Sequence, residues 1–220
     1  IADYRSEITG DPDSVNIRKR QIDTRVSDIQ FILDELEKIQ SGALRHPLNG
    51  YLDLSRIGIT GHSFGGSTAA LVAKKDTRVK AVSLIDGWMN PLPQDVIRNG
   101  IDQPFLYMGR PSWVDSDYPS SPSISEIMHN NNNGPTHHIT IKNTRHLNFC
   151  DAPLFTPIGK YLVEIGDIDR KRSVELVNQL SLEFFDMYLK QKPSALLSGS
   201  MIVPEFIYSN NFKNNTNASW

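Results

Sequence analysis

The chain has 220 residues and a formal net charge of −2, with 39% hydrophobic and 22% charged residues. These values are ordinary for a globular domain, and they exclude the strongly basic balance that a nucleic-acid-binding protein shows. The apolar runs stay shorter than the roughly 18–20 residues of a transmembrane helix, and the single cysteine, Cys150, excludes an internal disulfide.

A long helical pattern follows a polar, turn-rich loop over residues 1–14. From Val15 to Gln40, apolar residues recur at steps of three and four, which predicts an amphipathic helix. Strand-like and helix-like segments then alternate, with strands at 56–60, 79–86, 103–109 and 137–143 and helices at 65–75, from 123 and at 173–191. The tail over 192–220 has an irregular pattern. Strands separated by helices predict the α/β class with a mainly parallel sheet flanked by helices.

The segment RIGITGHSFGGST places Ser63 between a predicted strand and an alanine-rich helix. A serine hydroxyl becomes an effective nucleophile when a sharp strand–turn–helix exposes it beside a base. Such a turn needs small residues two positions before and after the serine, and Gly61 and Gly65 stand there. The backbone N–H of Phe64, in the first turn of the helix, is then the natural donor to an oxyanion. The pattern predicts a nucleophile elbow at Ser63.

A base and an acid are expected after the serine, in the order serine, acid, histidine. His146 follows the fourth strand in NTRHLNFCD and is the favoured base. His129 precedes an asparagine run and is predicted at the surface. Of His137 and His138, on the fourth strand, one is expected to pack and the other to face solvent. His62 lies inside the elbow and is expected to shape the pocket wall.

Two positions suit the acid. Asp86 ends the second strand, at the edge where the active sites of parallel sheets gather. Asp115 and Asp117 follow the third strand, in a segment whose serines and prolines also suit an exposed turn. From the residues alone, both placements can reach the base, and the acid is left open.

Three segments together, GHSFGGST, LIDGWMNPL and RHLNFCD, resemble the platelet-activating-factor acetylhydrolase family, also called lipoprotein-associated phospholipase A2. In that family a Gly-His-Ser-Phe-Gly-Gly elbow precedes a strand that ends in Asp, and a Trp-Met-x-Pro-Leu stretch follows. The similarity extends through GDIDRKRSVELVNQLSLEFFDMYL, so it covers about Val15 to Leu189. The resemblance implies an α/β-hydrolase fold and selects Asp86 as the acid beside Ser63 and His146.

The resemblance also implies a serine ester hydrolase that cleaves short or oxidised acyl groups at the sn-2 position of phospholipids, without calcium. The alternatives are a hydrolase of polyesters or small xenobiotic esters with the same fold, and a hydrolase-fold binding module whose triad is silent. The sequence shows no metal-ligand cluster and no phosphate-binding glycine loop, so no cofactor is predicted. The expected pocket walls are Trp88, Leu92, Trp113 and Phe149. The resemblance favours a secreted or periplasmic location.

The elbow strand of an α/β-hydrolase lies in mid-sheet, but no strand is predicted before residue 56. We therefore expect residues 1–220 to be the C-terminal portion of a single hydrolase domain. In that portion, 1–14 is a loop, 15–191 the catalytic core and 192–220 an irregular tail. An N-terminal fragment or second chain is expected to complete the sheet and supply the second oxyanion donor. Asn214 and Asn217 match the glycosylation pattern, for which a polar terminus is the preferred interpretation.

Overall fold

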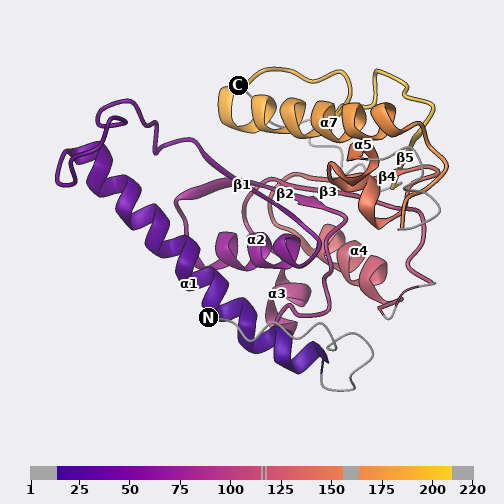
Figure 1. The fold of residues 1–220 in the computed structure, drawn as a ribbon, viewed down its shortest axis with the longest axis horizontal. Coiled ribbons are helices and arrows are strands. Elements are labelled where there is room, and N and C mark those ends of the chain that lie inside the picture. The colour runs from indigo at the N-terminus through magenta and orange to yellow at the C-terminus, as the bar shows by residue number, and fades with distance from the viewer. Residues whose placement is uncertain (1–13, 115, 117, 156–163, 210–220) are drawn as a thin grey trace.

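The computed structural model describes residues 14–114, 116, 118–155 and 164–209, which form a five-stranded sheet with helices on both faces (Figure 1). The strands are β1 (Ile57–His62), β2 (Val79–Ile85), β3 (Phe105–Gly109), β4 (Thr136–Ile141) and β5 (Phe206–Tyr208). The helices are α1 (Ser14–Ser41), α2 (Phe64–Lys75), α3 (Gln94–Asn99), α4 (Ser121–Asn131), the 3-10 helix η2 (His146–Phe149), α5 (Ala152–Phe155) and α7 (Arg170–Lys190).

The strands follow the order β1-β2-β3-β4-β5, with β1 to β4 parallel and β5 antiparallel to β4. This mostly parallel sheet confirms the predicted α/β class. The register aligns the last residues of β1 and β2, because His62 pairs with Ile85. The residues that follow these two strands, Ser63 and Asp86, therefore reach the same edge of the sheet.

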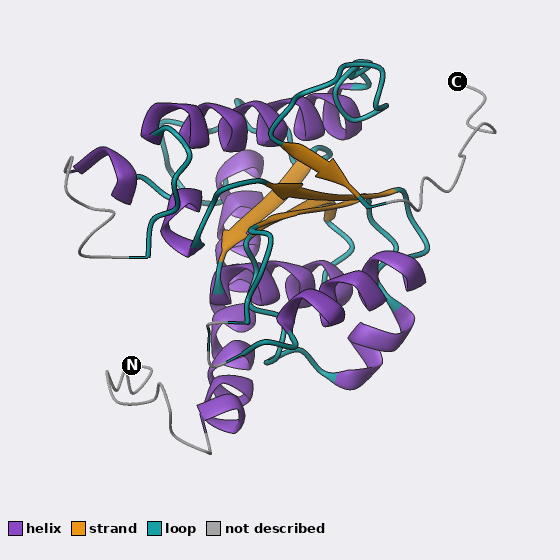
Figure 2. Cartoon of the chain, turned by 90° about the vertical axis from the view of Figure 1, so that its right-hand side faces the viewer, coloured by secondary structure: helices purple, strands orange, loops and turns teal. Residues whose placement is uncertain are grey.

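Helices cover both faces of the sheet (Figure 2), and two clusters of buried hydrophobic side chains hold them there. One contains side chains of α1, α2, α3 and α4, together with side chains from the strands. The other contains the buried face of α7, which includes Leu176, Leu180 and Phe184, as well as Leu106 and Ile139 from the strands. The sheet is thus covered on both sides, so strand residues on either face are shielded from solvent.

The two long helices match their predicted patterns. The apolar positions Ile22, Val26 and Leu33 of α1 are buried, which confirms the amphipathic helix. Helix α7 begins at Arg170, three residues earlier than predicted. The cause is Asp169, whose carboxylate accepts the backbone N–H groups of Lys171 and Arg172 at 3.0 and 2.9 Å and so caps the helix N-terminus.

Two boundaries differ from the sequence prediction. Strand β1 continues to His62, where residue 60 was the expected end, because Gly61 and His62 stay paired with β2. The tail that was predicted to be irregular contains β5, which pairs with residues 139–141 of β4. A strand of three residues is too short to show an alternating pattern in the sequence. Asn214 and Asn217 lie outside the described residues.

Strand β1 stands at one end of the sheet, and among the described residues β2 is the strand that pairs with it. The elbow strand therefore has one edge to which no described strand is bonded. In the same part of the chain, none of the helices combines the length and the apolar character needed to cross a bilayer.

Candidate active site

Ser63 lies at a strained turn between β1 and α2. Its φ and ψ of 57° and −123° fall outside the regions that most residues adopt. Backbone hydrogen bonds hold this geometry: the Ser63 N–H donates to the Ile85 carbonyl at 3.1 Å, and its carbonyl accepts the N–H groups of Gly66 and Trp88, both at 2.9 Å. The turn exposes the Ser63 side chain at the carboxyl edge of the sheet.

The glycines around Ser63 differ in whether the turn leaves room for a side chain at their positions. A Cβ on Gly61 would lie 2.1 Å from the Gly65 carbonyl oxygen, so no side chain fits there. A Cβ on Gly66 would lie 2.8 Å from the Cα of Gly87. At Gly65 the expectation was wrong, because a Cβ there would meet no described atom within 4 Å outside the surrounding helix backbone. The close packing of the elbow therefore rests on Gly61 and Gly66.

We predict that Gly61→Ala destabilises the fold and Gly65→Ala does not. Backbone must move to admit the new methyl group at residue 61, and overpacking of this kind costs roughly 1–3 kcal/mol or more. Urea unfolding of both variants measures the difference directly. Equal free energies of unfolding for the pair would contradict this account of the turn.

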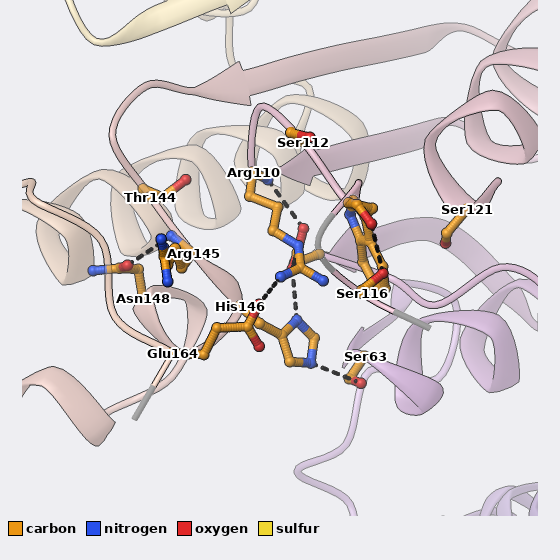
Figure 3. A network of polar contacts seen from close by, with 12 residues as sticks. Ser63, Arg110, Ser112, Ser116, Ser121, Thr144, Arg145, His146, Asn148 and Glu164 are labelled. Carbon is orange, nitrogen blue, oxygen red and sulfur yellow. Dashed lines mark hydrogen bonds and ion pairs between the residues drawn. The ribbon is translucent and has the colours of Figure 1, made fainter. Parts of the chain in front are cut away.

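His146 points its ring at the Ser63 side chain (Figure 3), and Asp86 lies on the other side of that ring. His146 Nε2 lies 3.0 Å from Ser63 Oγ, and His146 Nδ1 lies 2.6 Å from Asp86 Oδ2. The Asp86 side chain is fully buried, whereas that of His146 is 18% exposed. The structure thus brings together the serine, histidine and aspartate predicted from the sequence. Asp115 and Asp117, the other acids considered, lie outside the described residues.

The His146 turn is held by the buried side chain of Asn148. The Asn148 Oδ1 accepts the backbone N–H of Arg145 at 2.8 Å and that of Gly166 at 2.7 Å. Asn148 is 1% exposed, so these bonds are shielded from water. In the sequence, Asn148 belonged to the family motif, and its contacts explain why an amide is needed two residues after the histidine.

The family model described as platelet-activating factor acetylhydrolase, isoform II, matches residues 4–195. The chain belongs to this family. Similar proteins include the platelet-activating factor acetylhydrolases of Gallus gallus, 28% identical over 80% of this chain, and of Cavia porcellus, 28% identical over 90%. A probable 1-alkyl-2-acetylglycerophosphocholine esterase of Arthroderma benhamiae is 29% identical over 84% of this chain.

The chain spans about half the length of these relatives, with 44%, 49% and 48% of each covered. Among solved structures, a ferulic acid esterase from Streptomyces cinnamoneus matches with a TM-score of 0.69 and 24% identity. That match covers 87% of this chain and 55% of the esterase. It shows the fold, which is that of the α/β-hydrolases.

In this acetylhydrolase-family chain, His62 packs against the candidate base. Its ring stacks on that of His146 with centroids 4.5 Å apart, and its Nε2 donates to the His146 carbonyl at 3.2 Å. Burial, followed by the nearby His146, lowers the pKa of His62 from 6.5 to about 4. His62 therefore stays neutral near pH 7 and supports the His146 ring from one face.

Three further histidines are more buried than the sequence suggested. His129 is 3% exposed on α4, with its ring edge-on to His138 at 5.7 Å, so the predicted surface position was wrong. The prediction that one of His137 and His138 faces solvent was also wrong. His137 Nε2 bonds the Tyr188 hydroxyl of α7 at 2.7 Å, and His138 Nε2 bonds the Ser125 hydroxyl of α4 at 3.0 Å. Helices on both faces of the sheet explain why neither is exposed.

These histidines make stability depend on pH. Burial lowers the pKa of His62, His137 and His138 from 6.5 to about 4 in the folded protein. Between these values the unfolded chain binds protons that the folded chain does not, so the free energy of unfolding falls as the pH drops from about 6.5 to 4. Urea unfolding at intervals across this range measures the fall. His137→Phe should make the fall shallower, while His46→Gln, in an exposed loop, serves as the control.

The four expected pocket residues, Trp88, Leu92, Trp113 and Phe149, are all buried. The Trp113 ring meets His146 edge-on at 5.6 Å, and the Trp88 ring lies 5.8 Å from that of Phe64. Leu92 belongs to the cluster that includes side chains of α1 to α4, and Phe149 to the cluster that includes the buried face of α7. All four residues pack in the core, and the two tryptophans also make ring contacts with Phe64 and His146.

Sequence reasoning missed Arg110, which lies beside Asp86. The Arg110 backbone N–H donates to Asp86 Oδ1 at 3.0 Å, and its Nε lies 3.4 Å from Asp86 Oδ2. Its guanidinium also pairs with Glu164. The available signal was its place directly after β3, at the carboxyl edge of the sheet. In the described part of the chain, no group of three or more acidic, histidine or cysteine side chains suits a metal ion.

Proposed function

We propose that this protein is a serine carboxylic-ester hydrolase that works through an acyl-enzyme. The observation that carries the proposal is the hydrogen-bonded line from Ser63 Oγ through His146 to the buried carboxylate of Asp86. This is the arrangement in which a base activates a serine and an acid orients the base. The strained turn at Ser63 supports it, because strain of this kind is maintained where the hydroxyl must be presented to a substrate.

In the proposed mechanism, Ser63 Oγ attacks the ester carbonyl while His146 Nε2 takes the hydroxyl proton. Asp86 holds His146 with its proton on Nδ1 and stabilises the imidazolium that forms. The Phe64 N–H stands at the start of α2, where helix N–H groups lack intrahelical acceptors, and it donates to the oxyanion. His146 then protonates the leaving alcohol, and a water molecule activated in the same way releases the acid from Ser63.

The proposed substrates are phospholipids with a short or oxidised acyl chain at the sn-2 position. The family supports this, as do the relatives named platelet-activating factor acetylhydrolase and 1-alkyl-2-acetylglycerophosphocholine esterase. A hydrolase of polyesters or small esters and a silent binding module are the alternatives. Both share the fold, so substrate comparison and serine reactivity separate them.

We further propose that this chain is the C-terminal portion of one hydrolase domain, with its core over residues 15–191. A segment from elsewhere in the protein, or a second chain, would pair with the outer edge of β1 and supply the second oxyanion donor. Support comes from the position of β1 at the end of the described sheet and from the half-length match to the relatives. Loss of one oxyanion donor typically costs about 10²–10³ in kcat.

The test is labelling of the full-length gene product with a fluorophosphonate probe, followed by hydrolysis of 2-acetyl and 2-palmitoyl phosphatidylcholine beside p-nitrophenyl acetate. We expect labelling on Ser63 that requires the folded protein, and faster cleavage of the 2-acetyl lipid than of the 2-palmitoyl lipid. Cleavage of p-nitrophenyl acetate without either lipid would favour the small-ester alternative. Absence of labelling would favour the binding module.

A further inference from the structure

The Arg110 side chain lies buried beside Asp86. It is 5% exposed, and Asp86 is fully buried. Its Nε lies 3.4 Å from Asp86 Oδ2, the same oxygen that His146 Nδ1 approaches to 2.6 Å, and its backbone N–H occupies Oδ1. The Arg110 backbone therefore holds Oδ1 by a hydrogen bond, and the Arg110 side chain contacts Oδ2 as an ion pair, so both parts of this residue limit where the Asp86 carboxylate can lie.

Arg110 also reaches the turn that carries His146 (Figure 3). Its guanidinium pairs with the carboxylate of Glu164, and the Glu164 backbone carbonyl accepts the N–H of Leu147, directly after the histidine, at 3.0 Å. The guanidinium carbon lies 4.0 Å from the centroid of the Trp113 ring, which itself meets His146 edge-on. The Arg110 side chain therefore contacts Asp86 directly. It is linked to His146 through Glu164 and Trp113.

Once His146 is protonated, positive and negative charges alternate along the series His146, Asp86, Arg110 and Glu164. A buried guanidinium is costly without partners, and here it has two carboxylates and an aromatic face. Placed alone beside Asp86, Arg110 would oppose the positive charge that His146 gains during proton transfer. The carboxylate of Glu164, 45% exposed, offsets this effect from the other side of the guanidinium.

We propose that Arg110 is a positioning residue, anchored by Glu164, that fixes the Asp86 carboxylate and the His146 turn relative to each other. The inference rests on the proposed ester hydrolysis. A positioning role and a purely electrostatic role of Arg110 predict different changes in kcat when the side chain is replaced. Removing a positive charge beside Asp86 strengthens its stabilisation of the imidazolium, so a charge effect would leave proton transfer unimpaired. A loss of position would lower kcat.

The test compares Arg110→Met, Arg110→Lys and Glu164→Gln with the control Arg56→Met, which breaks an exposed ion pair with Asp53 far along the chain from these residues. The readouts are kcat and KM for p-nitrophenyl acetate on the plateau of the pH–rate profile, and the far-downfield proton NMR signal of the His146 Nδ1–H···Asp86 hydrogen bond. Misplacement of reacting groups by about 1 Å costs about 10²-fold.

We expect Arg110→Met to lower kcat by about 10²-fold with KM nearly unchanged, and to broaden or shift the proton signal. Arg110→Lys should recover part of kcat, because an ammonium keeps the charge without the planar fork. Glu164→Gln should show a smaller loss in the same direction, and it tests the anchor should Arg110→Met fail to fold. Arg56→Met should match the wild type.

Unchanged kcat and an unchanged proton signal in Arg110→Met or Glu164→Gln would overturn the inference. A wild-type protein with no esterase activity and no fluorophosphonate labelling would instead overturn the proposed function. In that case the proton signal still decides the positioning role, because it reports the His146–Asp86 hydrogen bond without turnover. The two failures are therefore distinguishable.

Discussion

Replacing Ser63 with alanine is expected to lower kcat for p-nitrophenyl acetate by on the order of 10⁶-fold, the loss found when the nucleophile of a serine hydrolase is removed. The alanine cannot form the acyl-enzyme, and His146 Nε2 loses the hydroxyl 3.0 Å away. Steady-state hydrolysis and fluorophosphonate labelling of the variant measure the loss.

The matched control is Ser112→Ala. Ser112 is an exposed residue after β3, and its hydroxyl accepts the Val114 N–H at 3.1 Å. This variant should keep nearly full activity. Both variants should have the same Tm as the wild type, since neither hydroxyl is buried in the core. If Ser63→Ala retained wild-type kcat, the nucleophile would have to be another residue.

The sequence predicted best the features that form from residues consecutive in the chain. The elbow could be predicted because a strand, a serine flanked by glycines and a helix follow one another without interruption, and the turn in the structure forms from those residues. Which glycines of the turn are needed for close packing could be predicted only in part. Whether a Cβ collides depends on atoms across the turn, which is why Gly61 matched the expectation and Gly65 did not.

Burial of the later histidines could not be predicted from their neighbours in the chain. His129 sits beside asparagines, but tertiary packing turns its ring toward β4, where it meets His138. His137 and His138 point to opposite faces of a sheet, and only the positions of α4 and α7 decide that both faces are covered. Alternation within a strand predicts which residues share a face and not what lies on it.

The contacts of Arg110 with Asp86 and Glu164 could not be predicted from neighbouring residues either. An arginine after a strand is most often solvated, and nothing in its own segment indicates a carboxylate from the neighbouring strand. The pairing of β2 with β3 brings Arg110 and Asp86 together, and Glu164 arrives from a segment more than fifty residues away. Contacts of this kind depend on sheet order and long-range loops, and so they appear only in the folded structure.

Replacing Asp86 with asparagine is expected to lower kcat by about 10⁴-fold, as in serine hydrolases whose triad acid becomes an amide. The carbonyl oxygen of the new amide can still accept the Arg110 N–H, which turns the amide NH₂ toward His146 Nδ1. That ring nitrogen must then accept a hydrogen bond, and the imidazole proton moves to Nε2. A protonated Nε2 facing Ser63 cannot take the hydroxyl proton, so the base is lost while the shape of the site is kept.

The variants Asp115→Asn and Asp117→Asn complete this experiment, because the sequence alone allowed either residue to be the acid. Each should keep kcat within a few-fold of the wild type if Asp86 serves His146. Asp86→Asn should also lower Tm, because the buried guanidinium of Arg110 keeps Glu164 but loses the Asp86 carboxylate, so kcat is compared at a temperature where both proteins are folded. A large loss in Asp115→Asn or Asp117→Asn, with Asp86→Asn active, would place the acid after β3 and leave Asp86 a structural partner of Arg110.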